Sequence, residues 1–304
     1  ILTEPRLSSF SSSYTFREIY YYKKLVNPNV KVIHRINECD ERKNTNFINK
    51  LLKKANIVAD HTVFVSAWLR NIHLANSIGL NSSSVILSGA DNTIFNNEGK
   101  VRWNKVENLK IVTHHWGNDW NKGFKIYSEL DKIIDKQKNF KFTYIGNLPN
   151  NFKFKNTNYL EPLSGLDLSN ELKSHHLYLT ASLNEPSGNH HIEAAQCGLP
   201  IMFINSGGIV EYCADYGLMF EDSNFYEKLL FMVENYDKFF DKVKNYSLSS
   251  ESTNKQFLEL FYKLTEENSK KTLNFVNFRI RLFQIVLFYY KVLKFIYIKL
   301  NAKN

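Results

Sequence analysis

The chain alternates between short apolar stretches and longer amphipathic ones. Short apolar runs are typical of buried strands, and apolar residues three or four positions apart are typical of helices that cover a sheet. Strands are expected at residues 30–34, 62–66, 84–88, 109–113, 140–146, 158–162, 177–182 and 200–204. Helices are expected at residues 47–57, 67–78, 124–138, 167–174 and 189–197, and a further helix is expected after the Gly207–Gly208 turn. Since parallel neighbours need a crossover connection, this alternation predicts an α/β protein with parallel sheets.

A polar stretch without periodicity, residues 92–108, separates two such blocks. We therefore predict two doubly wound domains that face a cleft, because ligands of such sheets bind at the carboxyl ends of the strands. The predicted parts are a first domain at 1–95, a linker at 96–108, a second domain at 109–250, a closing helix at 251–273 and a tail at 274–304. The first domain is expected to be incomplete, because the chain opens at Ile1 with what resembles the end of a strand.

Basic residues are concentrated in the tail. The formal charge is +9, but residues 270–304 hold eight Lys or Arg and no Asp or Glu, which leaves +1 for the rest. A nearly neutral body predicts no nucleic-acid partner. The longest charge-free stretch of the tail, 282–290, is far shorter than the ~18 residues of a spanning helix. An amphipathic helix on a membrane surface is therefore predicted for 274–304, and a helix packed on the protein's own body is the alternative.

Cysteine and histidine form no metal-site pattern. The three cysteines include no C-x-x-C pair, which argues against a disulfide framework or a zinc knuckle and favours a reducing cytosol. The histidines include three adjacent pairs, and adjacent side chains usually point apart. We therefore expect no metal ion and no cofactor.

The stretch from Glu185 to Pro200 carries the most specific chemistry. It follows an apolar strand and places Glu185 and Glu193 eight positions apart around Gly188. The glycine lets the backbone approach a ligand, and the helix after it presents unpaired N–H groups and a positive dipole end, which suit a diphosphate. The two carboxylates can accept hydrogen bonds from sugar hydroxyls, and a ribose diol is a natural partner there.

Two glutamates at this spacing also arise by chance, so the spacing alone is weak evidence for a ligand site. The segments before and after it provide the stronger evidence. Together with E-x7-E, the segments V-F-V-S-A-W-L-R, V-I-L-S-G-A-D-N-T-I-F, I-V-T-H-H-W-G-N-D-W-N-K-G-F and S-G-G-I-V-E-Y-C occur in order between residues 63 and 213. They resemble segments of the family 4 glycosyltransferases, and the resemblance covers roughly residues 31–264. It implies a GT-B fold with two Rossmann-like domains, and transfer of a sugar from a nucleotide-sugar with retention of configuration.

The resemblance also implies roles for single residues. Glu185, near the donor sugar, and Lys122, which binds the donor diphosphate, correspond to the catalytic positions. Glu193 corresponds to the glutamate that binds the ribose. The remaining donor-binding positions that correspond are Gly188, Asn189, His190, Gly207 and Gly208.

The sequence departs from the family in three places, one of which is the absence of the family's N-terminal glycine-rich loop. In the family, an arginine is common about five residues before the lysine that corresponds to Lys122, but residues 114–117 are His, His, Trp and Gly. His114 and His115 end a strand at the cleft, so one of them is expected to contact phosphate. In the first domain, Thr3 stands where a histidine is usual, and His34 is a substitute at the end of the next strand. Arg35 is a further acceptor-side candidate, although the charged run 34–43 also fits a salt-bridged surface loop.

The sequence therefore predicts a retaining glycosyltransferase of cell-envelope polysaccharide synthesis. Its donor would be a nucleotide-diphospho-sugar, its acceptor a glycan or a lipid-linked molecule, and its place the cytoplasm or the inner face of the plasma membrane. The alternative is a non-catalytic relative that binds a nucleotide-sugar or a glycan, which the missing arginine and Thr3 support. A scaffold that binds nothing is a third alternative.

Overall fold

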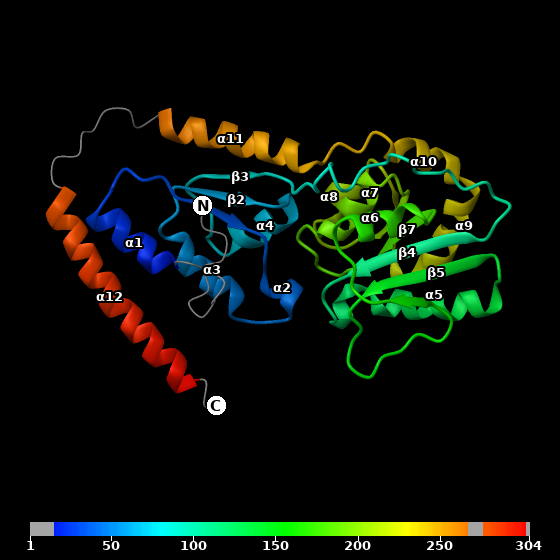
Figure 1. Cartoon of the computed structure of the whole chain (residues 1–304), viewed down its shortest axis with the longest axis horizontal. Helices are drawn as coiled ribbons and strands as arrows, with labels where there is room; N and C mark the ends of the chain where they lie inside the picture. The colour runs from blue at the N-terminus through cyan, green and yellow to red at the C-terminus, as the bar shows by residue number, and fades with distance from the viewer. Residues whose placement is uncertain (1–14, 267–275, 302–304) are drawn as a thin grey trace. The chain divides into compact units, whose positions relative to one another are not determined.

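The computed structural model describes residues 15–266 and 276–301. Contacts between residues divide the chain into two compact units (Figure 1). The first unit comprises the described residues of 1–64, 70–85 and 257–304, and the second comprises 65–69 and 86–256. The domain limits inferred from the sequence stay predictions.

The first unit is built on a three-stranded parallel sheet in the order β1-β2-β3. Its strands are β1 (Ile33–Ile36), β2 (His61–Phe64) and β3 (Ser83–Val85). The helices with residues in this unit are α1 (Phe16–Leu25), α2 (Asp40–Lys43), α3 (Ile48–Asn56), α4 (Ala67–Ala75), α11 (Ser250–Glu266) and α12 (Val276–Asn301). Val32, Ala55 and Val58 form a small buried cluster, on which Phe16 and Ile19 of α1 pack.

The second unit is built on a six-stranded parallel sheet in the order β6-β5-β4-β7-β8-β9. Its strands are β4 (Leu109–His115), β5 (Phe140–Gly146), β6 (Asn158–Leu160), β7 (Leu177–Thr180), β8 (Ile201–Ile204) and β9 (Leu218–Phe220). Its helices are α5 (Phe124–Lys136), α6 (Gly165–Lys173), α7 (Asn189–Gln196), α8 (Ile209–Cys213), α9 (Phe225–Glu234) and α10 (Tyr236–Val243), with short 3-10 turns at Trp120–Lys122 and Asp222–Asn224.

Both faces of the larger sheet are buried. Leu177 and Leu179 of β7 point into a cluster that contains Phe124 and Tyr127 of α5, whereas Tyr178 points into a second cluster with α6, α7 and α8. Successive residues of a strand face opposite sides, so one strand feeds both clusters. This double burial explains why the strands are almost continuously apolar in the sequence.

The predicted strands and helices are present, and their ends differ by a few residues. β5 covers its predicted range, and the hydroxyl of Ser66 accepts a hydrogen bond from the Leu69 amide at 3.2 Å, as expected for a residue that caps α4. The predicted elements do not include α1, α2, β9, α9 and α10. β9 has only three residues, and the consecutive tyrosines of α1 hide its helical period. The helix predicted at 251–273 is α11, which ends at Glu266, and residues 267–275 lie outside the described part.

Within the described ranges, no helix has an apolar run long enough to cross a membrane.

A buried carboxylate ties α5 to the loop before β6. Oδ1 of Asp131 accepts hydrogen bonds from the amides of Asn156 and Thr157 at 2.9 and 2.8 Å and from the Thr157 hydroxyl at 2.6 Å, while Oδ2 accepts one from the Lys155 amide at 3.1 Å. Burial alone would raise the pKa of Asp131, but these hydrogen bonds lower it below its usual value. The ionised carboxylate therefore stabilises this loop.

Replacing Asp131 by asparagine is expected to reduce the free energy of unfolding by about 1–3 kcal/mol at pH 7, because the amide cannot accept all these bonds. A lowered folded-state pKa contributes stability that is fully present above the usual carboxyl pKa of 3.8 and is lost as the pH falls through the lower folded-state pKa. The difference in stability between wild type and variant should therefore shrink progressively as the pH falls below 3.8. Urea unfolding of wild type and variant at pH 7 and at a series of lower pH values measures this difference in stability. Asp135→Asn on the same helix, where the carboxylate is exposed, is the matched control. An equal effect of both variants would contradict the prediction.

Candidate functional site

Two oppositely charged side chains meet beside the ends of β4 and β7, which are neighbours in the sheet. Lys122 belongs to the 3-10 turn after β4, and Glu185 lies on the loop after β7. Nζ of Lys122 is 2.6 Å from Oε2 of Glu185, and the two side chains are only 12% and 4% exposed. The structure therefore brings together the two predicted catalytic residues as a largely buried ion pair.

The second predicted glutamate lies nearby, on α7. Oε2 of Glu193 is 2.8 Å from Nε2 of His114 at the end of β4, and Nδ1 of this histidine is 3.2 Å from the hydroxyl of Tyr178 on β7. Tyr178 is missing from the sequence-based candidates, because a tyrosine in an apolar strand reads as core packing. Only the neighbouring positions of β4 and β7 show that its hydroxyl reaches the strand end.

Gly188 makes the turn from the Glu185 loop into α7. Its φ and ψ of 81° and 104° suit glycine alone among ordinary residues. A Cβ atom here would lie 2.7 Å from Cε1 of His190, 2.9 Å from Cε1 of His191 and 3.0 Å from Cγ of Glu185. The turn starts α7 at Asn189, so the amides of the first helical turn have no partner within the helix and form the positive end of its dipole.

The predicted turn Gly207–Gly208 holds the backbone of the Glu185 loop. The Gly208 amide donates a hydrogen bond to the Glu185 carbonyl at 2.8 Å, and the Asn184 amide donates one to the Ser206 hydroxyl at 2.9 Å. A Cβ atom on Gly207, whose φ is +67°, would lie 2.6 Å from both N and O of Glu185. The close approach of the two loops therefore depends on glycine.

Four histidines are buried beneath this loop: His114, His115, His190 and His191. Nε2 of His115 hydrogen-bonds the Tyr127 hydroxyl at 2.8 Å, and the rings of His115 and His190 are 4.5 Å apart. Burial, with smaller contributions from nearby positive charges, lowers the pKa of His115 and His190 well below the usual value and that of His191 to about 3. These three rings are therefore neutral at pH 7, and positive charge at the site comes from Lys122 and the α7 dipole. The predicted histidine–phosphate contact stays a prediction.

The acceptor-side candidates belong to the first unit. Thr3 lies outside the described residues. His34 is fully buried on β1, where its Nδ1 is 3.1 Å from Nδ2 of Asn56, and burial together with the charge of His73 lowers its pKa to about 3. Arg35 follows on the same strand and is partly exposed. Their acceptor role stays a prediction.

Within residues 15–266 and 276–301, no three His, Cys, Asp or Glu side chains are grouped so that they could hold a metal ion.

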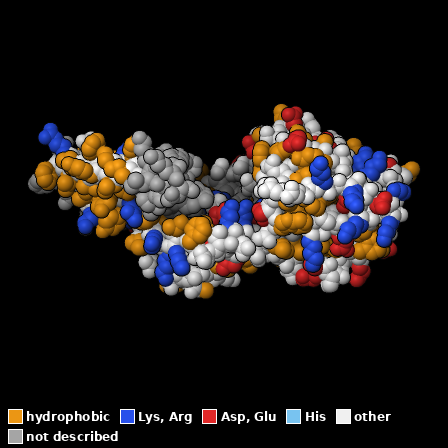
Figure 2. All heavy atoms as spheres, turned by 90° about the horizontal axis from the view of Figure 1, so that it is seen from below, with side chains coloured by type: hydrophobic (Ala, Val, Ile, Leu, Met, Phe, Trp, Pro, Cys, Tyr) orange, Lys and Arg blue, Asp and Glu red, His pale blue; other side chains and the backbone are white. Residues whose placement is uncertain are grey.

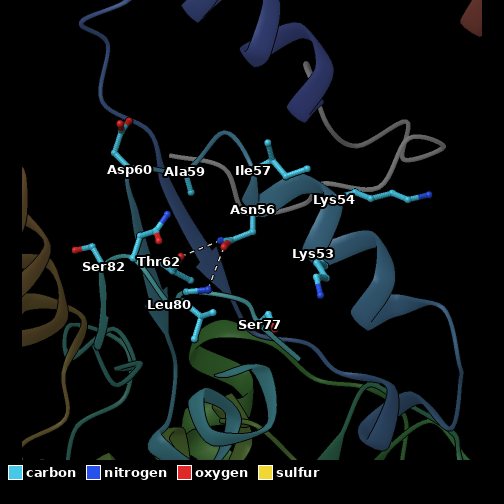
Figure 3. A pocket seen from close by; sticks show the side chains of 12 residues that line it. Lys53, Lys54, Asn56, Ile57, Ala59, Asp60, Thr62, Ser77, Leu80 and Ser82 are labelled. Carbon is cyan, nitrogen blue, oxygen red and sulfur yellow. Dashed lines mark hydrogen bonds between the residues drawn. The ribbon is translucent and has the colours of Figure 1, made fainter. Parts of the chain in front are cut away.

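The first unit also contains a cavity of about 450 Å³ near the starts of β2 and β3 (Figure 3). Asn56 stands in its wall, where it donates a hydrogen bond to the Thr62 hydroxyl at 2.8 Å and accepts one from the Gly79 amide at 3.1 Å. Asp60 is paired with Lys23 at 2.6 Å. These polar groups serve the fold, and the cavity lies at the amino ends of the strands, away from the end where ligands of such sheets bind.

Comparison with known proteins relates the second unit to a known family of domains and the chain to a known fold. Residues 112–243, less than half of the chain, match the family model of the group 1 glycosyl transferases, and the match includes Lys122, Glu185 and Glu193. No curated protein matches the sequence. Membership of family 4 stays a prediction.

Solved structures share the fold at low identity. HepE from Anabaena, in complex with UDP and glucose, is 15% identical with a TM-score of 0.60, over 76% of this chain and 71% of that one. A glycosyltransferase from Rickettsia africae is 16% identical with a TM-score of 0.62, over 86% and 84%. The catalytic domain of starch synthase IV from Arabidopsis thaliana, bound to ADP and acarbose, is 14% identical with a TM-score of 0.63, over 82% and 70%. The predicted GT-B fold is thereby confirmed.

The Gly188 turn can be tested by its stability. Gly188→Ala is expected to reduce the free energy of unfolding by about 2–3 kcal/mol, because the backbone conformation is strained for alanine and Cβ meets two histidine rings. Gly165→Ala is the control, since Gly165 also has a positive φ, of +57°, but open space around it. That variant should cost only about 1 kcal/mol. Equal losses in urea unfolding would show that the packing of the turn contributes nothing.

Proposed function

We propose that the second unit binds a nucleotide-diphospho-sugar and that the protein transfers the sugar to a glycan or lipid-linked acceptor. The observation that carries this is the meeting of Lys122 with Glu185 beside the start of α7, with Glu193 one turn further on. Lysine and a helix N-terminus together bind diphosphates, and paired carboxylates bind sugar hydroxyls. The relatives solved with UDP and glucose, and with ADP and acarbose, support a donor of this class.

The ion pair gives each residue a task. When the donor binds, the ammonium of Lys122 leaves the Glu185 carboxylate and contacts the donor diphosphate instead. The amides at the start of α7 bind the same phosphates. The carboxylate of Glu185 is then released to accept hydrogen bonds from the sugar. As the sugar leaves, charge grows on the diphosphate, and Lys122 with the helix dipole stabilises it, so this site needs no metal ion to neutralise the phosphates.

The stereochemistry and biological role are part of the proposal. In a retaining, front-face transfer, the leaving diphosphate accepts the proton of the acceptor hydroxyl as the new glycosidic bond forms on the same face. Membership of family 4, a role in cell-envelope polysaccharide synthesis, and a place in the cytoplasm or at the inner face of the plasma membrane follow from the resemblance and the basic tail.

A non-catalytic nucleotide-sugar-binding protein is the second candidate. It is favoured by the absence of an arginine from residues 114–117 and by Thr3, which stands where a histidine is usual in the family that the sequence resembles. Both candidates bind a donor, but only the enzyme releases a nucleoside diphosphate from it. Turnover in the presence of candidate acceptors, or slow hydrolysis without them, therefore separates the two.

The donor site can be tested with UDP, GDP, ADP and their sugars in a thermal-shift assay. One nucleotide is expected to raise the melting temperature of the wild type. Lys122→Ala should weaken its binding about 10–100-fold, because a charge-assisted hydrogen bond is worth about 1.5–3 kcal/mol. Glu193→Ala should weaken it about tenfold through the ribose.

Lys125→Ala is the matched control for these variants, since Lys125 carries the same charge on an exposed side chain of α5. It should leave nucleotide binding unchanged. A folded wild type that responds to no nucleotide would contradict the proposed donor site.

The membrane part of the proposal rests on α12. One side of this helix packs on α1, where the rings of Phe283 and Tyr22 are 5.6 Å apart and the hydroxyls of Tyr290 and Thr15 are 3.2 Å apart. The other side exposes apolar side chains at helical spacing: Phe278, Leu282, Ile285, Phe288, Tyr289, Val292, Leu293, Phe295 and Ile296. Figure 2 shows hydrophobic side chains with Lys and Arg among them at the end where α12 lies.

This face suits an anionic lipid surface. The sequence of α12 contains five Lys or Arg and no Asp or Glu, so its charge complements acidic headgroups. A helix that is apolar on its outer face and basic throughout lies in the interface between headgroups and acyl chains. A lipid-linked acceptor would then lie in the same membrane surface that the first unit contacts.

The double variant Ile285→Asp, Val292→Asp tests this surface in the full chain. Wild type is expected to sediment with vesicles of phosphatidylcholine and phosphatidylglycerol, and the variant to bind at least about tenfold more weakly, because burying each apolar side chain is worth about 1.5–3 kcal/mol. Leu258→Asp, on exposed α11, is the control and should bind like wild type. Unchanged sedimentation of the double variant would contradict the membrane proposal.

A further inference from the structure

His114 lies where it can fix the carboxylate of Glu193. Its side chain is 6% exposed, and its Nε2 is 2.8 Å from Oε2 of Glu193. On the opposite side of the ring, Nδ1 is 3.2 Å from the hydroxyl of Tyr178. The three side chains therefore form a chain of hydrogen bonds that runs from β7 through the end of β4 to α7.

The direction of the protons follows from the partners. Burial raises the pKa of Tyr178 well above its usual value, so its hydroxyl stays protonated. The hydroxyl accepts a hydrogen bond from the His114 amide at 3.3 Å. Its own proton can be donated to Nδ1 at 3.2 Å or to the His114 carbonyl at 3.5 Å, and Nδ1 is the nearer acceptor. With Nδ1 as the acceptor, Nε2 carries the proton that is donated to the carboxylate of Glu193.

The carboxylate of Glu193 therefore has one oxygen that is hydrogen-bonded to His114 and one oxygen that a ligand can bind. Oε2 of Glu193 is bound by His114, and among the residues that the structure describes no hydrogen bond reaches Oε1. The side chain is 19% exposed, so a ligand can approach it. A glutamate held in this way has already lost much of the rotational freedom that binding would otherwise remove.

We propose that His114 is a positioning residue, which orients Glu193 to bind the ribose hydroxyls of the donor nucleotide, and that Tyr178 sets the tautomer that makes this possible. This rests on the proposed function, because it assigns a ribose to the site. It gives His114 a task different from the predicted phosphate contact. Substrate atoms contact Glu193, and His114 acts through it.

The variants must separate positioning from packing. The ring of His114 lies 5.6 Å from that of Tyr178 and 6.2 Å from that of His190, so truncation would leave a hole. His114→Phe fills this space with a ring but has no donor for the carboxylate. His114→Gln keeps an N–H donor of similar reach and is the conservative variant.

The test is calorimetric titration with the nucleoside diphosphate that the wild type prefers among UDP, GDP and ADP, and with its 2′,3′-dideoxy analogue, which lacks the diol. Wild type should bind the ribonucleotide about tenfold more tightly than the analogue. His114→Phe and Glu193→Ala should each lower the ratio of the two affinities towards one, and their affinity for the analogue should stay at the wild-type value. His114→Gln should retain most of the preference.

Two results would overturn the inference with the proposed function intact. If His114→Phe weakened the ribonucleotide and the analogue equally, the role of His114 would be structural. If it left the preference at the wild-type value, His114 would have no part in ribose binding. Absence of any nucleotide binding by the folded wild type would instead overturn the proposed function, and this inference with it.

Discussion

The buried ion pair between Lys122 and Glu185 is the interaction on which the account of this molecule depends. Removing two charges from water costs several kcal/mol for each ion, and their attraction seldom returns more than this cost. Apolar side chains at the two positions would fill the space with a smaller penalty. The pair is therefore better explained by a ligand that separates it than by a contribution to stability.

The surrounding loops are arranged to hold that pair in place. Glu185 is fixed through its backbone by the Gly208 amide, and the approach of the two loops excludes any side chain on Gly207. Gly188 then turns the chain so that α7 starts directly after the glutamate. Lys122, the two glutamates and the start of α7 all belong to the second unit, so the proposed donor site lies within a single compact body.

The sequence was informative where chemistry and local structure coincide. Strands such as β8 are apolar on both sides because both faces of the sheet are covered, and a run of this kind can be recognised without a structure. Glu185 and Glu193 could be selected because they flank a glycine turn that follows a strand, and Lys122 could be selected through the family resemblance. Their meeting at one place depends on the sheet order, in which β4 and β7 are neighbours although β5 and β6 lie between them in the sequence. This order is not visible along the chain.

The contacts that the sequence could not show are those between side chains of different strands. Tyr178 looks like a core residue in its strand, and only its position beside the end of β4 brings its hydroxyl to His114. The burial of His115 and His190 against each other is equally invisible in a pattern of adjacent histidines. The exposed apolar face of α12 could be anticipated from composition, but which side α1 covers required the structure.

The measurement that tests the central claim most directly is the affinity of the protein for a nucleoside diphosphate relative to the matching monophosphate, in wild type and in Lys122→Ala. If Lys122 faces a diphosphate, wild type should bind the diphosphate at least about tenfold more tightly, and the variant should lose most of this difference. A wild type that binds both nucleotides equally, or a variant that keeps the full difference, would contradict the account.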